Sequence, residues 1–282
     1  MKIKTILTLI LIILPLNVYG NFLKLNTPAK QVILYDHELK KVLFEKNSND
    51  LMKPASMAKI MTAYIVFDRL QEGSLNLDDT FVVSKNAWQK GGSRTFLKLN
   101  SEVTIRDLLM GLIVQSGNDA AIVLAEGIAG SEEDFAIQMN QYANSLEMKN
   151  TYFTNSTGWP HEDLKTTAYD LIILTEALIN NFPKLYKLFV EKEFTFNNIR
   201  QPNRNPLLIG RYKVPGADGL KINGVLITEL DGQSSTSVNA NDKSYFGRMA
   251  LKVKPYTPYI TKPNEALLNN CCFGGTFNTN NG

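Results

Sequence analysis

Cysteine is nearly absent from this sequence of 282 residues: only Cys271 and Cys272 occur, and they are adjacent. The ring that a disulfide between neighbours would close is strained, so such pairs rarely form a structural bridge. A fold that depends on disulfides is therefore excluded. A chain of this length can bury a large apolar core instead.

Histidine and a strong charge of one sign are also missing. His37 and His161 are the only histidines, and their spacing matches no metal-binding motif. Trp88 and Trp159 fit the wall of a core or cleft better than a cofactor box. The 30 basic and 27 acidic residues leave a net charge of +3, and no basic stripe is interleaved with aromatics. We therefore expect no metal, no cofactor and no nucleic-acid partner.

Long apolar runs are confined to the N-terminus. Residues 6–16 are almost wholly apolar and follow the basic residues Lys2 and Lys4, as in a secretory signal. The run is about half of the ~20 apolar residues that a spanning helix needs. The sequence therefore predicts that residues 1–20 are a signal peptide and that the protein is exported to the periplasm or cell envelope.

The remaining pattern begins with β-prone runs, continues with amphipathic segments opened by capping residues, and ends with further β-prone runs. The predicted strands are residues 31–35, 42–45, 193–196 and 220–228. The predicted helices are residues 57–70, 105–115 and 119–128, one opened by Ser131 with Asp134, and one opened by Thr167 with Asp170. This order favours an α+β fold, in which one antiparallel β-sheet made from both ends of the chain packs against a helical layer.

Residues 54–59 read Pro-Ala-Ser-Met-Ala-Lys and carry the first chemical signal. A serine hydroxyl needs a base within hydrogen-bond reach to become a nucleophile. Ser56 and Lys59 share one face if Ser56 lies in the first turn of a helix, and the positive end of the helix dipole disfavours a charged lysine. Alone, this spacing is more often a helix start followed by a solvated side chain.

A second signal is Ser116-Gly117-Asn118, in a short break between two predicted helices. A tight polar loop is expected at such a break in any case. Beside an activated serine, however, a second hydroxyl can relay a proton and an asparagine amide can hold a peptide-like substrate.

Together these motifs resemble the set S-x-x-K, S-D/G-N and K-T/S-G of penicillin-binding proteins and class A β-lactamases. The forms found here resemble the D-alanyl-D-alanine carboxypeptidases, which are low-molecular-mass penicillin-binding proteins. The resemblance runs from about Thr27 to Lys221. It also includes residues 91–93, residues 115–120, Phe153, Asn155, Gly158, and Arg204 with Asn205. It implies a β-lactamase/transpeptidase-like fold, with residues 21–253 as the catalytic domain.

The resemblance assigns the catalytic roles. Ser56 would attack the carbonyl of the D-Ala–D-Ala bond of a peptidoglycan pentapeptide stem, Lys59 would take its proton, and Ser116 would pass a proton to the departing D-alanine. β-Lactam antibiotics would act as covalent inhibitors of the same serine.

The resemblance also assigns the substrate-binding residues. Asn118 would hold the substrate backbone, and Lys221 and Arg204 would attract the substrate carboxylate. The backbone N–H groups of Ser56 and Gly224 would form the oxyanion hole.

The third motif departs from the family pattern, because Ile222 and Asn223 stand where Thr/Ser-Gly is expected after Lys221. Residues 232–242 are small and polar, and residues 254–282 form an atypical tail in place of the family's β domain and amphipathic membrane helix. This predicts a frameshift or truncation near Lys221 and impaired activity, and it leaves membrane association open.

Two other functions remain as alternatives. A class A β-lactamase would need a glutamate that activates the deacylating water, and Glu162 lies in a suitable region. A non-catalytic remnant that binds penicillin or peptidoglycan would keep Ser56 but lack a working third motif.

Overall fold

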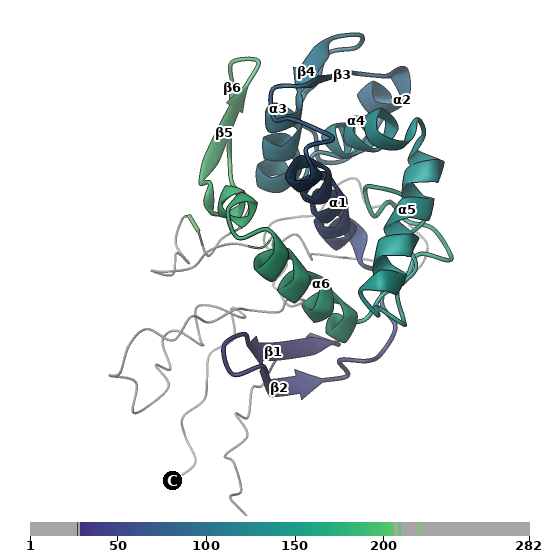
Figure 1. Cartoon of the computed structure of the whole chain (residues 1–282), viewed down its shortest axis with the longest axis vertical. Helices are drawn as coiled ribbons and strands as arrows, with labels where there is room; N and C mark the ends of the chain where they lie inside the picture. The colour runs from purple at the N-terminus through teal and green to yellow at the C-terminus, as the bar shows by residue number, and fades with distance from the viewer. Residues whose placement is uncertain (1–26, 28, 206–207, 210–219, 221–282) are drawn as a thin grey trace, which may run out of the picture.

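Helices and short antiparallel ladders alternate in the part of the chain that the computed structural model describes, which is residues 27, 29–205, 208–209 and 220 (Figure 1). The helices are α1 Ala58–Glu72, α2 Lys85–Gln89, α3 Ile105–Met110, α4 Asn118–Ala129, α5 Glu132–Ser145 and α6 Ala168–Asn181, with the helical turns η1 Ala55–Met57, η2 Gly111–Gln115 and η3 Leu185–Val190. The strands are β1 Val32–Asp36, β2 Lys41–Lys46, β3 Thr80–Val82, β4 Glu102–Thr104, β5 Glu193–Phe196 and β6 Ile199–Pro202. Within these residues the ladders are β1–β2, β3–β4 and β5–β6.

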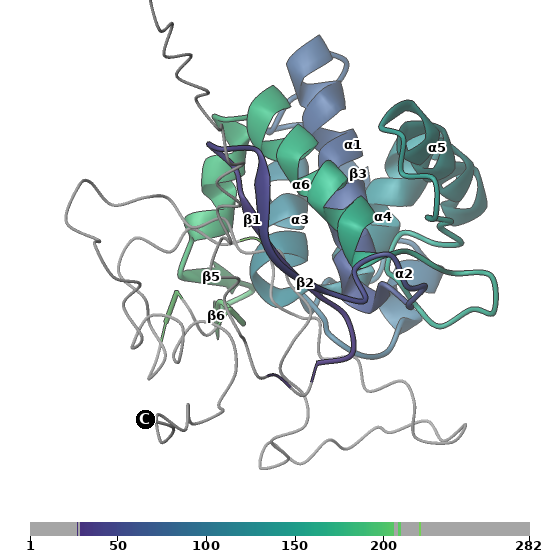
Figure 2. The same cartoon turned by 90° about the horizontal axis from the view of Figure 1, so that it is seen from below.

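The first ladder is the hairpin that the sequence predicts. β1 and β2 pair antiparallel, and the carboxylate of Asp36 accepts hydrogen bonds from the N–H groups of Glu38 and Leu39 at 3.0 and 2.9 Å, which fixes the turn. β1 packs against α6, and Figure 2 shows the hairpin lying across that helix. The hairpin thus covers one side of the helical layer.

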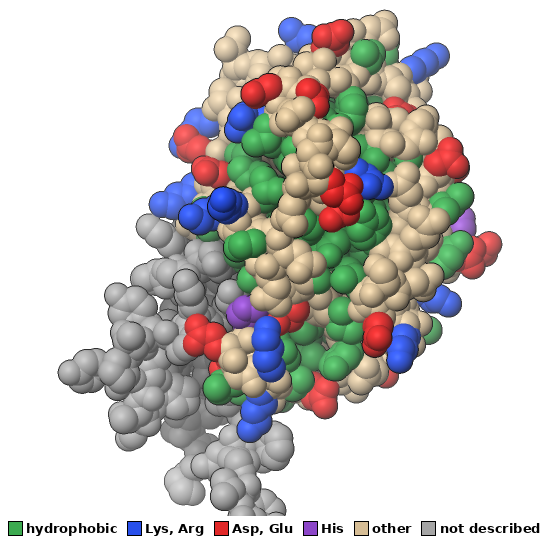
Figure 3. Space-filling view, viewed as in Figure 1, with side chains coloured by type: hydrophobic (Ala, Val, Ile, Leu, Met, Phe, Trp, Pro, Cys, Tyr) green, Lys and Arg blue, Asp and Glu red, His purple; other side chains and the backbone are tan. Residues whose placement is uncertain are grey.

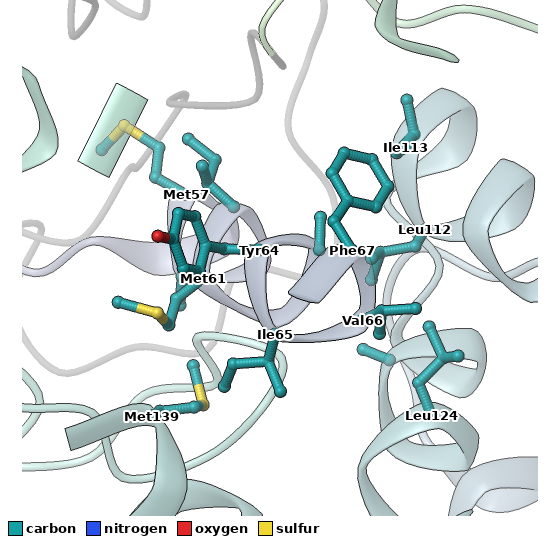
Figure 4. Close-up of a cluster of buried hydrophobic side chains, with 14 of the residues drawn as sticks. Met57, Met61, Tyr64, Ile65, Val66, Phe67, Leu112, Ile113, Leu124 and Met139 are labelled. Atoms are coloured by element: carbon teal, nitrogen blue, oxygen red, sulfur yellow. The ribbon is translucent and has the colours of Figure 1, made fainter. Parts of the chain in front are cut away.

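The centre of the core is α1. Every residue from Ala58 to Phe67 is buried, as expected for a helix with neighbours on all sides. α4, α5 and α6 each contact it. Figure 4 shows Val66 on the side of α1 that faces Leu124 of α4, and Ile65 on the side that faces Met139 of α5. The core therefore fixes the helix that begins beside Ser56.

The predicted caps open their helices. In each case a threonine or serine hydroxyl accepts the N–H of the aspartate three residues later, at 3.0–3.1 Å. The pairs are Thr104 with Asp107, Ser131 with Asp134, and Thr167 with Asp170. These local signals place the helix starts correctly.

The prediction of one α-helix over residues 105–115 is wrong in its second half. α3 ends at Met110 and the chain continues as the π-helix η2. A Cβ at Gly111 would lie 2.2 Å from Oγ1 of Thr95, so Thr95 occupies the space beside this turn. The wider turn lets the N–H of Gly117 reach the carbonyl of Gly111 at 3.0 Å. The change in winding thus occurs where η2 lies against Thr95.

The α+β class and the antiparallel strands are confirmed. β5 is predicted correctly, and its partner β6 was not predicted. Apart from Leu220, the predicted strand over residues 220–228 lies outside the described residues, so a sheet made from both ends of the chain stays a prediction. The boundaries of the signal peptide, the catalytic domain and the tail stay predictions as well.

Acidic and basic side chains are interspersed on the face that Figure 3 shows, instead of being grouped by sign. Over the described ranges, none of the helices has the length and apolar character to cross a bilayer.

The core contacts predict a strong contrast between two isoleucines. Ile122 in α4 is fully buried, whereas Ile137 in α5 is 56% exposed. Ile122→Ala should lower the free energy of unfolding by about 2–5 kcal/mol because it leaves a cavity. Ile137→Ala should change it by less than about 0.5 kcal/mol. Urea unfolding of both variants checks this, and equal losses would contradict the placement of α4 in the core.

Candidate active site

Ser56 lies in the turn η1, immediately before α1. The preceding residue, Ala55, has a φ of 47°, in the left-handed region that costs a non-glycine residue roughly 1–2 kcal/mol. Gly158 packs on the same backbone, because a Cβ there would lie 1.7 Å from the carbonyl oxygen of Ala55. The serine is thus held in a strained turn that a second loop supports from outside.

Lys59 is the second residue of α1 and its side chain points to that serine. Nζ lies 3.3 Å from Oγ of Ser56 and donates a hydrogen bond of 2.7 Å to the carbonyl of Thr157. Only 2% of the residue is exposed. Ser56 and Lys59 therefore share one face at the start of the helix, as the sequence predicts.

Burial lowers the pKa of Lys59 from 10.5 to about 7, and the positive charges of Arg204 and Lys90 act in the same direction. The carboxylates of Glu132 and Asp119 oppose this shift. A large fraction of Lys59 is therefore neutral near pH 7 and can accept a proton from Ser56.

Ser116 ends η2 in the left-handed conformation, with φ 62° and ψ 32°. It is completely buried, and within the described part of the chain its Oγ has no hydrogen-bond partner. Leaving a buried hydroxyl unpaired costs about 1–3 kcal/mol. η2, which Ser116 ends, packs against α1, the helix that begins beside Ser56.

Asn118 is the first residue of α4 and is clamped to the segment of residues 91–93. Its Nδ2 donates to the carbonyl of Gly91 at 2.8 Å, and its backbone N–H donates to the carbonyl of Ser93 at 2.8 Å. Gly92 has a φ of 81°, and a Cβ there would lie 2.8 Å from Nδ2 of Asn118. The asparagine and this glycine segment therefore form one unit.

Arg204 follows β6 and joins that unit to η2. Its guanidinium donates to Oγ of Ser93 and, at 3.4 Å, to the carbonyl of Gln115. Part of the residue is exposed, whereas burial lowers the pKa of its guanidinium. The structure thus brings Arg204 to the loop that carries Ser116 and Asn118.

Lys221 and Gly224 lie outside the described residues, as do Ile222 and Asn223. The residue before them, Leu220, is buried, and its carbonyl accepts a hydrogen bond from Nδ2 of Asn205 at 3.4 Å. Directly before the third motif, the chain therefore lies beside Asn205, the residue that follows Arg204.

The sequence interpretation missed two features of the site. Asp119 is buried, and its carboxylate accepts the N–H of Thr95 at 2.8 Å and that of Leu97 at 3.2 Å. A single charged residue at the start of an alanine-rich helix was the available signal. The second feature, the carbonyl of Thr157 beside Lys59, has no signal, because every residue carries a carbonyl.

Metal binding has no support from the described ranges, where no group of three or more His, Cys, Asp and Glu residues is placed to hold an ion. His37 contacts Glu176, and His161 lies 3.7 Å from Asp163.

Comparisons with known proteins agree on one family. A family model described as D-alanyl-D-alanine carboxypeptidase, peptidase S11, matches residues 22–225. The D-alanyl-D-alanine carboxypeptidase DacC of Escherichia coli (strain K12) is 45% identical over 186 residues, which are 64% of this chain and 46% of that protein.

Solved structures give the same result. Penicillin binding protein 5 from Haemophilus influenzae aligns with a TM-score of 0.64 at 37% identity, over 65% of this chain and 54% of that one. The ampicillin-bound penicillin-binding protein D2 from Listeria monocytogenes aligns with a TM-score of 0.62 at 26% identity, over 70% of this chain and 79% of that one. The chain spans about half the length of the curated relatives that it matches.

The contact between Gly158 and the turn before Ser56 predicts that Gly158→Ala is severely destabilising. Gly73 is the matched control, because its φ of 77° is nearly that of Gly158 at 76°, but a Cβ there would meet nothing within 4 Å. Gly73→Ala should cost about 1–2 kcal/mol from backbone strain alone. Gly158→Ala should cost clearly more, because the turn at Ala55 must also move. Equal losses in urea unfolding would show that the contact does not constrain the turn.

Proposed function

The chain belongs to the D-alanyl-D-alanine carboxypeptidase family, and on this premise we propose that it removes the terminal D-alanine from peptidoglycan stem peptides through a Ser56 acyl-enzyme. The observation that carries the proposal is the arrangement of Ser56, Lys59 and Thr157. It combines a hydroxyl, a buried amine 3.3 Å away with a pKa of about 7, and a carbonyl that orients the amine.

In the acylation step, neutral Lys59 accepts the proton of Ser56 while Oγ attacks the carbonyl carbon of the D-Ala–D-Ala bond. The oxyanion that forms needs donors that are already in place. The backbone N–H of Ser56 lies in the first turn of a helical segment, where N–H groups have no intrahelical partner. Gly224 is the second donor that we propose on the family pattern.

In the collapse of the tetrahedral intermediate, the C–N bond breaks and the departing D-alanine takes a proton. We assign to Ser116 the relay of this proton from protonated Lys59 to the amine nitrogen, because the buried Oγ of Ser116 has no other partner within the described residues. Asn118 would hold the substrate backbone, and Arg204 together with Lys221 would attract the terminal carboxylate. A water molecule then hydrolyses the ester and returns Ser56 to its free state.

β-Lactam antibiotics are the second class of ligand in this proposal, because they acylate the same serine. The relative from Listeria monocytogenes, solved in ampicillin-bound and cefotaxime-bound forms, supports this. Export to the periplasm or cell envelope follows from the predicted signal over residues 1–20 and from the stem-peptide substrate.

The β-lactamase alternative is not favoured. The matched family and the relatives named above are carboxypeptidases and penicillin-binding proteins. Glu162 is exposed, and it is its backbone carbonyl that accepts a hydrogen bond, at 2.5 Å from Nζ of Lys53. In the remaining alternative, a non-catalytic remnant, residues 221–224 do not form a working third motif. Turnover of a D-Ala–D-Ala peptide decides between this alternative and a working enzyme.

The nucleophile assignment predicts that Ser56→Ala abolishes covalent labelling by a fluorescent penicillin while the far-ultraviolet circular dichroism stays unchanged. Ser145→Ala is the control, because Ser145 is an exposed serine at the end of α5. It should label like the unsubstituted chain. Persistent labelling of folded Ser56→Ala protein would remove Ser56 as the nucleophile.

The base assignment predicts a pH dependence of acylation. Because the pKa of Lys59 is lowered to about 7, the neutral form predominates above that pH and the protonated form below it. The second-order acylation rate constant should therefore be constant above about pH 8 and fall about tenfold per unit below about pH 7.

Lys59→Arg tests the same role, because a guanidinium stays protonated. It should lower acylation by a factor of about 10²–10⁴ at every pH. Lys149→Arg, at an exposed position, should change nothing. A rate constant of Lys59→Arg that equals that of the control would refute Lys59 as the base.

A further inference from the structure

The loop of residues 156–158 lies along the nucleophile helix and contacts it at successive points. The carbonyl of Ser156 accepts a hydrogen bond of 2.7 Å from Oγ1 of Thr62, and the carbonyl of Thr157 accepts one of 2.7 Å from Nζ of Lys59. Gly158 then packs on the carbonyl of Ala55. Ser156 and Thr157 are almost completely buried. A displacement of this loop would therefore move the carbonyl to which Lys59 donates its hydrogen bond.

The same loop is held from its other side by one carboxylate. Oε1 of Glu132 accepts hydrogen bonds from the backbone N–H of Ser156 at 3.1 Å and from its Oγ at 2.7 Å. Glu132 is the first residue of α5, where the helix dipole favours a negative charge. α5 also contacts α1, so the hydrogen bonds from Ser156 join the loop to a helix that packs against the one carrying Lys59.

Asn155, directly before the loop, holds it in a tight turn. Its Oδ1 accepts the N–H of Trp159 at 2.8 Å and the hydroxyl of Thr157 at 2.8 Å. These hydrogen bonds brace the loop from within, and those from Ser156 to Glu132 join it to α5. A residue that does not touch Lys59 can in this way set the position of the carbonyl that does.

The position of that carbonyl has a chemical consequence. A neutral lysine amine has two N–H bonds and one lone pair. When one N–H is directed to the carbonyl of Thr157 at 2.7 Å, the rotation of the amine is restricted and the lone pair can be directed to Ser56. The charged groups that act on Lys59 from the described residues are Arg204, Lys90, Asp119 and Glu132. Asp119 already directs its carboxylate to backbone N–H groups, which leaves Glu132 as the carboxylate that is joined to the loop.

We propose that Glu132 is a positioning residue for the reaction: by holding Ser156, it places the carbonyl of Thr157 so that Lys59 is oriented towards Ser56. The proposal rests on the proposed function, in which Lys59 is the base. Glu132 has a second effect, because its negative charge stabilises the protonated form of Lys59. Hydrogen-bond geometry and charge are separable by substitution.

Two variants of Glu132 give opposite expectations. Glu132→Gln keeps an oxygen that can accept both hydrogen bonds from Ser156 but removes the charge. The high-pH plateau of the penicillin acylation rate should stay within about twofold, and the acidic limb should move to lower pH. Glu132→Asp keeps the charge but withdraws the carboxylate by one methylene. Its plateau should fall about tenfold or more, because small misplacements of a catalytic group have large effects on rate.

Glu133 supplies matched controls, because it is the next residue in the same turn of α5 and is exposed. Glu133→Gln and Glu133→Asp should leave both the plateau and the acidic limb unchanged. If Glu132→Asp acylates at the plateau rate of Glu133→Asp, the positioning role is wrong. If Glu132→Gln loses the plateau as completely as Glu132→Asp, the hydrogen bonds to Ser156 are not what matters, and the proposal is overturned as well.

A second measurement does not depend on acylation. Nuclear magnetic resonance of chain labelled with ¹³C-lysine reports the order parameter of the ε-methylene of Lys59, assigned by its absence in Lys59→Arg. The order parameter should fall in Glu132→Asp and stay unchanged in Glu132→Gln and in both Glu133 variants. An unchanged order parameter in folded Glu132→Asp overturns the proposal. If the unsubstituted chain is not acylated but the order parameters are as expected, only the proposed function is overturned.

Discussion

A lysine buried beside a serine hydroxyl is the arrangement on which the rest of the site depends. Removing an ammonium group from water is costly, so a lysine at this depth lowers its pKa and needs a hydrogen-bond partner for its nitrogen. Here the carbonyl of Thr157 is that partner, and the start of α1, beside Arg204 and Lys90, disfavours the charge further. The same burial that is unfavourable for the charged side chain leaves a large fraction of the amine neutral near pH 7.

The packing around α1 holds this lysine in place. The helix is buried along its first ten residues, so its N-terminal turn cannot shift without disturbing the core. Gly158 packs on Ala55 beside that end, η2 contacts α1, and Arg204 is close enough to lower the pKa of Lys59. Glycines allow the closest of these approaches, since a Cβ at Gly158 would overlap the carbonyl of Ala55. Site and core are therefore parts of one packed unit.

Local signals in the sequence were reliable where the physical cause was itself local. A hydroxyl three residues before an aspartate caps a helix through its own neighbours, and a polar turn between β-prone runs forms a hairpin. The errors occurred where distant residues decided the outcome. The wider winding of η2 occurs beside Thr95, which lies sixteen residues before Gly111 in the sequence. The pairing of β5 with β6 depends on a strand whose own composition gave a weak signal.

The sequence by itself determined the family, the spacing of Ser56 and Lys59, and the helix starts, because each of these is a short pattern of residue types. The tertiary structure decided what surrounds Lys59: the carbonyl of Thr157, and the carboxylate of Glu132 behind it. Every residue has a backbone carbonyl, so the sequence does not indicate which one contacts Lys59. The hydrogen bonds between Glu132 and Ser156 join residues 24 positions apart. Contacts of this kind exist only after the helices have packed, because packing alone sets the distances between such residues.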